Sequence, residues 1–336
     1  MNAVKEAPDY LHDEHLSQGT KTYLNVLNGG GPAVESLPVP GARRVLADVR
    51  AGGGGVLADL RAAVPVDLSG VEESERTIES EGRTLRLNLV RPEGTGRERL
   101  PVFVFVHGGG WVLGDYPTHR RLVRDLVAES GCAAVFVNYT PSPEARFPQA
   151  VEEIYIAVKW VAENGREIGV DGSRLALAGN SVGGNMALGG AGVGGGPQTR
   201  RLVRMWPVTD AGYDWDSYAE YGRQRFLTAP LMKWMFEQYV SDPAQRGSDL
   251  MSPVRASAER LRGLPPTLIA VAENDILRDE GEEMGRLLDA AGVEVTTVRF
   301  NGVIHDWGML NGFAGLHPTR TLVRLAGAVL RDYLRE

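Results

Sequence analysis

The chain has 336 residues, a formal net charge of −7 and a hydrophobic fraction of 43%. These values fit one large α/β domain with an appendage, or two domains, and give no sign of a nucleic-acid partner. No apolar stretch is long enough for a transmembrane helix, and no apolar segment follows basic residues near Met1. We therefore expect a cytoplasmic protein without a membrane partner. The one cysteine, Cys132, is expected to be a buried core thiol.

Helical patterns fill the first 70 residues, and no strand pattern occurs among them. The predicted segments are 9–28, 43–49 and 56–64, interrupted by glycine and proline runs. We interpret residues 1–70 as N-terminal cap helices over a catalytic domain at 71–336. His12 and His15 lie three residues apart in the first segment, but no third ligand is apparent, so no metal site is expected.

From about Glu75 onwards, strand and helix patterns alternate. Leu85, Leu87 and Leu89 alternate with polar residues, as in a half-buried antiparallel edge strand. The apolar runs that resemble buried strands are 102–106, 133–137, 175–178, 202–206, 267–272 and 293–300. Helical patterns separate or follow these runs at 119–129, 148–164, 279–291 and 319–334. The alternation predicts an α/β fold, a mostly parallel sheet of about eight strands with helices on both faces.

One segment, about 208–262, interrupts the alternation and is rich in aromatic residues. They are Tyr213, Trp215, Tyr218, Tyr221, Phe226, Trp234, Phe236 and Tyr239. We interpret the segment as a helical cap insertion. Its aromatic residues can form an amphipathic layer, line a substrate pocket, or do both.

The stretch Gly179–Gly183 follows the apolar run 175–178 and reads Gly-x-Ser-x-Gly. This pattern suits a sharp strand-to-helix turn that holds Ser181 at its apex and aims the Val182 N–H at whatever the hydroxyl attacks. At the glycine content of this chain, about 0.2 such matches are expected by chance. The pentapeptide therefore needs support from elsewhere in the sequence.

A second, more specific motif is His107-Gly108-Gly109-Gly110, directly after the run 102–106. With six histidines and 42 glycines in the chain, it is expected about 0.01 times by chance. Consecutive glycines allow backbone N–H groups to approach a ligand closely. Together with the Val182 N–H they can form an oxyanion hole.

Candidates for a carboxylate and a base lie after the later strands. Glu273, Asp275 and Asp279 follow the run 267–272, and Asp275 is preferred because Asp279 begins a helix. His305 lies in the loop after the last strand, whereas His107 more plausibly braces the glycine loop. The carboxyl ends of parallel strands meet at one edge of a sheet, so these groups can converge there.

These motifs together resemble the hormone-sensitive-lipase-like branch of the α/β-hydrolase family. The matching blocks are His107–Trp111, Tyr139–Glu144 with Phe147-Pro148, Gly179–Gly184, Asp275–Gly281 and His305. The resemblance implies Ser181 as nucleophile, Asp275 as acid and His305 as base. It also implies an oxyanion hole built from Gly108, Gly109, Gly110 and Val182, in which Gly108 shapes the loop.

The resemblance further implies a serine carboxylesterase that needs no cofactor and acts on small ester substrates of short to medium chain length. An amidase or deacetylase with the same mechanism is an alternative. A non-catalytic small-molecule-binding protein is another, although proteins of that kind in this branch lack the histidine base. A homodimer through the strand at 293–300 is also a hypothesis.

Three features depart from the pattern or complicate it. Asn180 and Val182 replace the commoner Asp and Ala around the serine, and many glycines follow, so the helix after the turn is expected to be short or weak. Arg201 and Arg204 fall within a predicted buried strand, and Arg204 needs a partner or an exit to solvent. The run Gly190–Gly195 matches a dinucleotide motif, but no strand precedes it, so nucleotide binding is not expected.

Overall fold

The computed structural model describes residues 9–29, 31–51, 66–96, 98–191 and 199–335. An eight-stranded sheet runs through this part of the chain in the order β1-β2-β4-β3-β5-β6-β7-β8. The strands are β1 (Val71–Ser80), β2 (Arg83–Pro92), β3 (Leu100–Val106), β4 (Ala133–Asn138), β5 (Val170–Asn180), β6 (Arg201–Met205), β7 (Thr267–Asn274) and β8 (Val295–Ile304).

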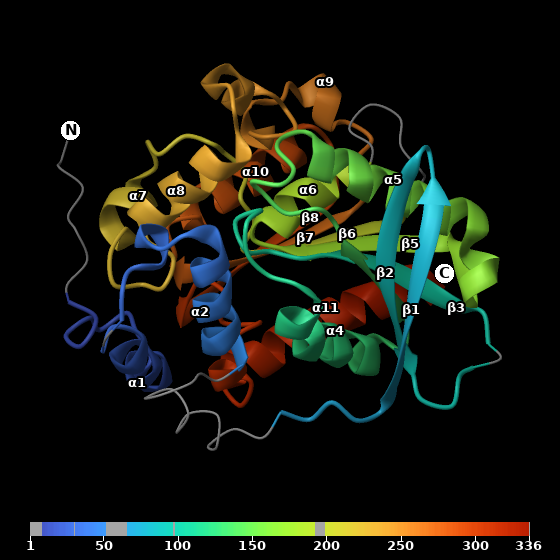
Figure 1. Cartoon of the computed structure of the whole chain (residues 1–336), viewed down its shortest axis with the longest axis horizontal. Coiled ribbons are helices and arrows are strands. Elements are labelled where there is room, and N and C mark those ends of the chain that lie inside the picture. The colour runs from blue at the N-terminus through green and yellow to red at the C-terminus, as the bar shows by residue number, and fades with distance from the viewer. Residues whose placement is uncertain (1–8, 30, 52–65, 97, 192–198, 336) are drawn as a thin grey trace.

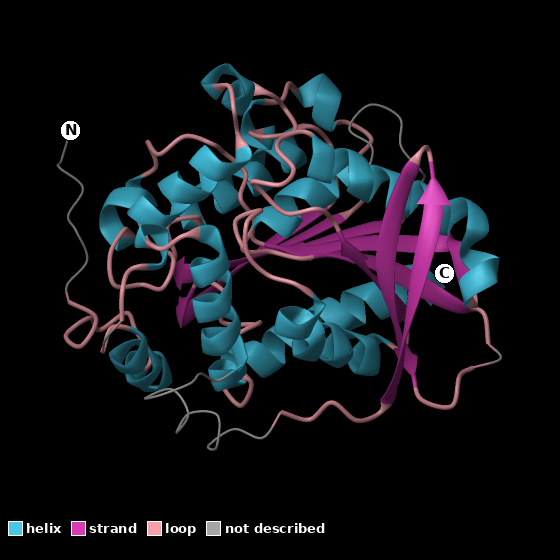
Figure 2. Cartoon of the chain, viewed as in Figure 1, coloured by secondary structure: helices cyan, strands magenta, loops and turns pink. Residues whose placement is uncertain are grey.

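Helices cover both faces of this sheet (Figure 1 and Figure 2). Helices α4 (Tyr116–Ser130) and α11 (His317–Arg335) pack against each other on one face. Helices α5 (Gln149–Asn164), α6 (Val182–Gly190) and α10 (Arg278–Ala290) lie on the other. The predicted α/β fold, with a mostly parallel sheet covered on both sides, is confirmed.

The predicted position of the edge strand is wrong. Strand β2 is antiparallel, but it pairs with β1 on one side and with β4 on the other, where Leu87 lies opposite Val137. Leu85 and Leu87 are buried accordingly. The edge is β1, whose charged sequence leaves most of its residues exposed. The remaining neighbours, from β4 through β3 to β8, are parallel.

The N-terminal segment is less helical than its spacing predicts. The first helix, α1, covers only Gln18–Leu27, and residues 9–16 form turns. The side chains of Asp9 and Asp13 accept hydrogen bonds from the backbone N–H groups two residues on, at 3.0 Å and 2.9 Å, which favours turns over helix. The second helix is α2 (Val39–Ala51), and the predicted helix at 56–64 lies outside the described residues.

The segment between β6 and β7 contains α7 (Asp216–Tyr221), α8 (Ala229–Tyr239) and α9 (Ala258–Leu261). In Figure 1, α7 and α8 lie at the end of the sheet where α1 and α2 also lie, and α9 lies at the top of the view, farther from them. None of the described helices is long and apolar enough to cross a membrane.

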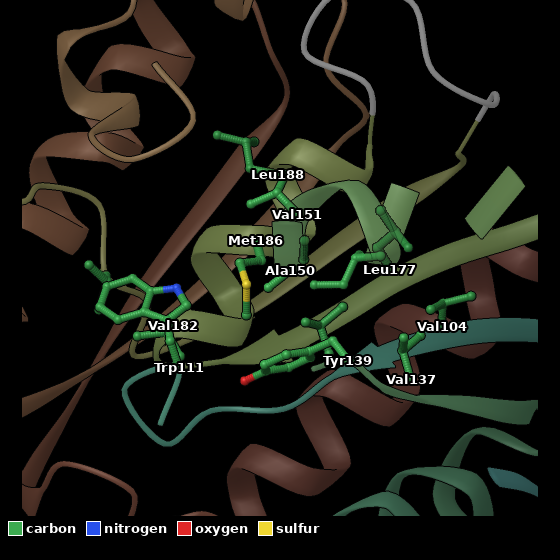
Figure 3. Packing of buried hydrophobic residues seen from close by; sticks show 14 of the residues in the cluster. Val104, Trp111, Val137, Tyr139, Ala150, Val151, Leu177, Val182, Met186 and Leu188 are labelled. Atoms are coloured by element: carbon green, nitrogen blue, oxygen red, sulfur yellow. The ribbon is translucent and has the colours of Figure 1, made fainter. Parts of the chain in front are cut away.

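Two apolar cores fill the space between the sheet and its helices. One core includes Val182 and Met186 of α6 with Val104 and Leu177 of the sheet, and Figure 3 shows part of it. The other core joins the opposite face of the strands to α4 and α11, and it holds the buried Cys132. Because both faces are packed, the strand positions are fixed, and so are the loops that leave their carboxyl ends.

Candidate active site

Ser181 lies at the sharp turn between β5 and α6. Its backbone has φ 54° and ψ −126°, a conformation that non-glycine residues rarely adopt. The motif glycines are required by close backbone contacts. A Cβ at Gly179 would lie 2.4 Å from the Gly183 carbonyl oxygen, and one at Gly183 would lie 2.1 Å from the Val106 carbonyl oxygen. The sequence therefore builds the strained turn that the Gly-x-Ser-x-Gly pattern predicts.

A continuous hydrogen-bonded chain links Ser181, His305 and Asp275. The distance from Ser181 Oγ to His305 Nε2 is 3.0 Å, and the distance from His305 Nδ1 to Asp275 Oδ2 is 2.7 Å. The second carboxylate oxygen, Asp275 Oδ1, accepts a hydrogen bond from the Leu277 N–H at 3.0 Å. All three side chains are buried. The chain order and geometry are those by which an imidazole can remove a serine proton while a carboxylate fixes its tautomer.

The two rival carboxylates point elsewhere. Glu273 binds His15 through Oε1 and the Gly302 N–H through Oε2, at 3.0 Å and 2.8 Å. Asp279 accepts hydrogen bonds from the Ser217 N–H and from Arg278. Of the three candidates, the structure brings Asp275 to His305.

The loop after β3 holds its glycines in backbone conformations that suit them. Gly109 and Gly110 have φ values of 115° and 62°. A Cβ at Gly110 would also overlap Met235 Sδ at 2.0 Å. Among the described residues, no group accepts a hydrogen bond from the N–H of Gly109, Gly110 or Val182. These three donors lie around Ser181 and can serve a developing oxyanion.

Gly108 differs from its two neighbours in the loop. Its N–H donates to Asn180 Oδ1 at 3.0 Å. A Cβ at this position would lie 2.7 Å from Asn180 Nδ2, so only glycine fits. This contact agrees with a role in shaping the loop, as expected from the sequence.

His107 braces the same loop from behind. It is buried, its Nδ1 lies 2.8 Å from the Gly108 carbonyl oxygen, and its ring stacks on Tyr139 with the centroids 4.1 Å apart. The Tyr139 hydroxyl donates to the His107 carbonyl oxygen at 3.1 Å.

A small cavity of about 20 Å³ lies over Ser181. Its lining residues are Gly109, Gly110, Ser181, Phe226, Leu227, Leu231, Met235, His305 and Asp306. Of the eight aromatic residues in the insertion, only Phe226 lines this cavity. Others form core contacts instead, such as Tyr239, whose ring stacks on Trp111 at 4.4 Å. A larger cavity of about 390 Å³ lies between α4 and α11, but it contains none of the predicted site residues.

Asp306 lies near the site and was not predicted from the sequence. Asp306 follows His305, and its Oδ1 accepts hydrogen bonds from Asn180 Nδ2 at 3.2 Å and from Trp206 Nε1 at 2.8 Å. The same oxygen lies 3.9 Å from His305 Nε2. Polar residues next to the nucleophile and next to the base were the available hint.

Arg204 is buried behind the serine turn, as its strand position predicts. Its Nε donates to the Gly184 carbonyl oxygen at 2.8 Å. Burial lowers its pKa to about 9, and the nearby Glu280 acts in the opposite direction. Burial likewise raises the pKa of Glu280 well above its ordinary value, although the N–H groups of Thr209 and Asp210 bind that carboxylate. Through its bond to the Gly184 carbonyl oxygen, the Arg204 guanidinium holds the first turn of α6 in place.

Arg201, the other arginine of this strand, is also buried but pairs with side chains at the protein surface. Its guanidinium lies 3.8 Å from the centroid of the Tyr333 ring, and its Nη1 lies 3.3 Å from Glu294 Oε1. No group of three or more histidine, cysteine, aspartate or glutamate side chains in the described parts of the chain could hold a metal ion.

A doubly wound sheet with a serine at the strand-to-helix turn and a histidine and a carboxylate on later loops defines a hydrolase-type fold. Residues 103–309 match a family described as alpha/beta hydrolase fold. The chain belongs to the α/β-hydrolase family, in its hormone-sensitive-lipase-like branch.

Curated relatives and solved structures agree with this assignment. The chain is 33% identical to an ethyl acetate hydrolase of Pseudomonas putida over 232 residues, which cover 68% of this chain and 72% of that protein. It is 35% identical to the carboxylesterase NlhH of Mycobacterium tuberculosis over 241 residues, 69% of this chain and 74% of the relative. The crystal structure of a thermostable esterase from Pseudomonas putida superposes with a TM-score of 0.90 at 48% identity, covering 96% of this chain and 98% of that one.

Proposed function

We propose that this protein is a serine carboxylesterase with Ser181 as nucleophile, His305 as base and Asp275 as acid. The observation that carries the proposal is the buried hydrogen-bonded chain from Ser181 Oγ through His305 to Asp275. The similarity to proteins named esterase, carboxylesterase and ethyl acetate hydrolase supports the reaction class.

The geometry suits a two-step reaction through an acyl-enzyme. His305 Nε2 takes the Ser181 proton as the hydroxyl oxygen attacks the ester carbonyl carbon. The tetrahedral intermediate collapses, and the same imidazolium protonates the leaving alcohol. A water molecule, deprotonated by His305, then attacks the acyl-enzyme and releases the carboxylic acid. Asp275 holds the imidazole in the tautomer that presents an unprotonated Nε2 to the serine.

The negative charge that develops on the carbonyl oxygen needs donors that are already in place. We assign this role to the N–H groups of Gly109, Gly110 and Val182, which none of the described residues engages. Gly108 belongs to the same loop but donates to Asn180, so its part is to set the loop's shape. Loss of one such donor costs about 3–4 kcal/mol of transition-state stabilisation in comparable sites.

The substrates of this proposal are carboxylic esters with short to medium acyl chains. The support is the narrow cavity over Ser181 and its apolar side chains, among them Phe226, Leu231 and Met235. A pocket with walls of this kind favours small apolar groups.

Three further parts of the proposal concern the setting of the site. Residues 1–70 and about 208–262 form the cap over a catalytic domain at 71–336. The reaction takes place in the cytoplasm, which fits a single buried cysteine. A homodimer through β8 also stays a prediction, and its basis is that β8 is the second edge of the sheet.

The decisive experiment compares wild type with Ser181→Ala on p-nitrophenyl acetate and p-nitrophenyl butyrate. The exposed Ser173→Ala serves as the matched control. We expect hydrolysis to be lost in S181A and kept in S173A. Equal hydrolysis by S181A and wild type would rule out the proposed nucleophile.

A paired anilide substrate distinguishes an amidase, and absence of fluorophosphonate labelling at Ser181 would favour a binding protein.

A further inference from the structure

Asn180 connects two loops that the proposed reaction requires. It lies directly before Ser181 in the sequence, and its side chain is fully buried. On one side, its Oδ1 accepts the Gly108 N–H at 3.0 Å. On the other side, its Nδ2 donates to Asp306 Oδ1 at 3.2 Å. One amide therefore joins the glycine loop after β3 to the loop that carries His305.

The chemistry of the two partners fixes the orientation of this amide. The Gly108 N–H can only donate, so it requires the amide oxygen. The Asp306 carboxylate accepts from the amide nitrogen and from Trp206 Nε1, which is 2.8 Å away. With an aspartate in place of Asn180, the bond to Gly108 could remain. The bond to Asp306 could not, because two carboxylates would face each other without a proton between them.

Asp306 needs such support because of its own backbone. Its φ is 62°, in the left-handed region that a non-glycine residue adopts at a cost. This strained residue directly follows His305, so its conformation affects how the loop presents the imidazole. The hydrogen bonds from Asn180 and Trp206 hold the Asp306 side chain in place at the end of the sheet where Ser181 lies.

Asp306 also places a carboxylate near the reacting atoms. Its Oδ1 lies 3.9 Å from His305 Nε2, whereas Asp275 Oδ2 binds Nδ1 on the opposite side of the ring. His305 therefore lies near two carboxylates, the Ser181 hydroxyl at 3.0 Å and the Trp206 ring, whose plane is at 74° to that of the imidazole. A negative charge at this distance favours the imidazolium form, which is the form that donates a proton to the leaving alcohol.

We propose that Asn180 and Asp306 form a positioning clamp that sets the oxyanion loop against the base loop and favours the imidazolium form of His305. The inference rests on the proposed esterase function. Neither residue needs to touch the substrate for this role. Asn180 acts through Gly108, and Asp306 acts through His305.

The test is a charge-exchange cycle of three variants: Asn180→Asp, Asp306→Asn and the double variant N180D/D306N. In N180D the two carboxylates repel, and we expect kcat on p-nitrophenyl butyrate to fall about 10- to 100-fold with little change in KM. In the double variant the two groups are exchanged. The amide nitrogen introduced by D306N can donate to the carboxylate introduced by N180D, but it then occupies the Oδ1 position that also accepts from Trp206, so the Trp206 bond is lost. We therefore expect the double variant to recover part of the kcat that N180D loses.

The single variant D306N tests whether the negative charge of Asp306 acts on His305. We expect a modest loss of kcat, about threefold, and a shift of the acidic limb of kcat/KM to lower pH by about one unit, because one negative charge near His305 is removed. A purely structural contact would change thermal stability without moving that limb. For N180D the control is Asn164→Asp, at the C-terminal end of α5, which adds a carboxylate elsewhere and should leave kcat and the acidic limb at the wild-type level.

Two outcomes overturn the clamp: a double variant no more active than N180D, or an acidic limb that stays in place in D306N. Thermal unfolding provides a readout that does not depend on activity. N180D should unfold at a lower temperature than wild type, and the double variant should regain part of that stability. If S181A is as active as wild type, the proposed esterase function is wrong. Failure of the clamp and failure of the proposed function therefore give different results.

Discussion

Asp13 and Arg225 form an ion pair of 2.7 Å in which both side chains are 2% exposed. The pair joins the N-terminal segment to the segment between β6 and β7, across 212 positions of sequence. Arg225 immediately precedes Phe226 and Leu227, which line the cavity over Ser181. The N-terminal turns are therefore anchored to the wall of the candidate substrate pocket.

Removal of the Asp13 carboxylate should strongly destabilise the protein. In Asp13→Ala the Arg225 guanidinium stays buried without this counter-charge, a situation that costs about 3–5 kcal/mol. Urea unfolding followed by tryptophan fluorescence measures the loss. Glu14→Ala, an exposed acidic neighbour, is the control and should change the free energy of unfolding by less than about 0.5 kcal/mol. Equal stability of the two variants would contradict a structural role for the pair.

A second N-terminal contact makes stability depend on pH. His15 Nδ1 lies 3.0 Å from Glu273 Oε1, and the hydrogen bond and charge of Glu273 raise the pKa of His15 above its ordinary 6.5. Because the folded-state pKa is raised, the stabilisation is fully present below pH 6.5 and disappears as the pH rises through the folded-state value. The His15 side chain is 69% exposed, so solvent screening limits the effect to less than about 1 kcal/mol.

His15→Gln should therefore unfold at a lower temperature than wild type at about pH 5.5 and at the same temperature at about pH 9. His12→Gln, whose imidazole is 81% exposed and lies 3.7 Å from Asp9, is the control. It should track wild type at both pH values. A difference between H15Q and wild type that persists at high pH would assign the contact to packing and not to charge.

The sequence was sufficient to predict the parallel strands and the candidate site residues that follow them. The continuous apolar runs identify buried parallel strands, and parallel strands bring their carboxyl ends together at one edge. Ser181, Asp275 and His305 each follow such a run, so their convergence can be inferred without coordinates. The three-glycine loop is predictable for the same reason.

Contacts between distant segments were not predictable. Glu273 and Asp275 are two residues apart, and periodicity alone does not decide which one meets His305. In the structure Glu273 binds His15, 258 positions away, and the Gly302 N–H instead. The bond from Asn180 to Asp306 spans 126 positions and depends on the close approach of two loops. The N-terminal turns depend on aspartate side chains that compete with helical hydrogen bonding.

The glycines after Ser181 have a different meaning from the one their composition suggests. Helix α6 is short, nine residues, as predicted. Its glycines also allow contacts that a side chain would block, since a Cβ at Gly189 would lie 2.7 Å from Val151 Cγ1, and one at Gly183 lies against Val106. Low helix propensity at these positions is thus coupled to close packing between α6, β3 and α5.

Gly183→Ala should therefore abolish activity and destabilise the fold, although alanine is the better helix former. Its Cβ would meet the Val106 carbonyl oxygen at 2.1 Å, and backbone cannot move aside as a flexible side chain can. Gly247→Ala is the matched control, because no atom lies within 4 Å of its Cβ position. Thermal unfolding and p-nitrophenyl acetate hydrolysis measure both variants. A G183A enzyme with wild-type activity would show that the turn tolerates a shift of α6.

Met235 should limit the acyl chain that the site accepts. Its side chain packs against Gly110 and lines the narrow cavity with Leu227 and Leu231. Met235→Ala removes the part of this wall nearest the glycine loop. We expect the ratio of kcat/KM for p-nitrophenyl octanoate to that for the butyrate to rise about tenfold, the lower end of the discrimination that one methylene group gives in an apolar pocket.

The ratio of the two kcat/KM values is the informative quantity. Any loosening of the glycine loop lowers the rates for both esters together, so its effect cancels in the ratio. Met232→Ala is the matched control. Met232 lies on the same helix and is buried, but it does not line the cavity. Both substitutions remove a buried methionine and should cost about 2–5 kcal/mol of stability. Only M235A should change the chain-length preference. If M232A changes it equally, the pocket wall is set by the position of helix α8 as a whole and not by the Met235 side chain.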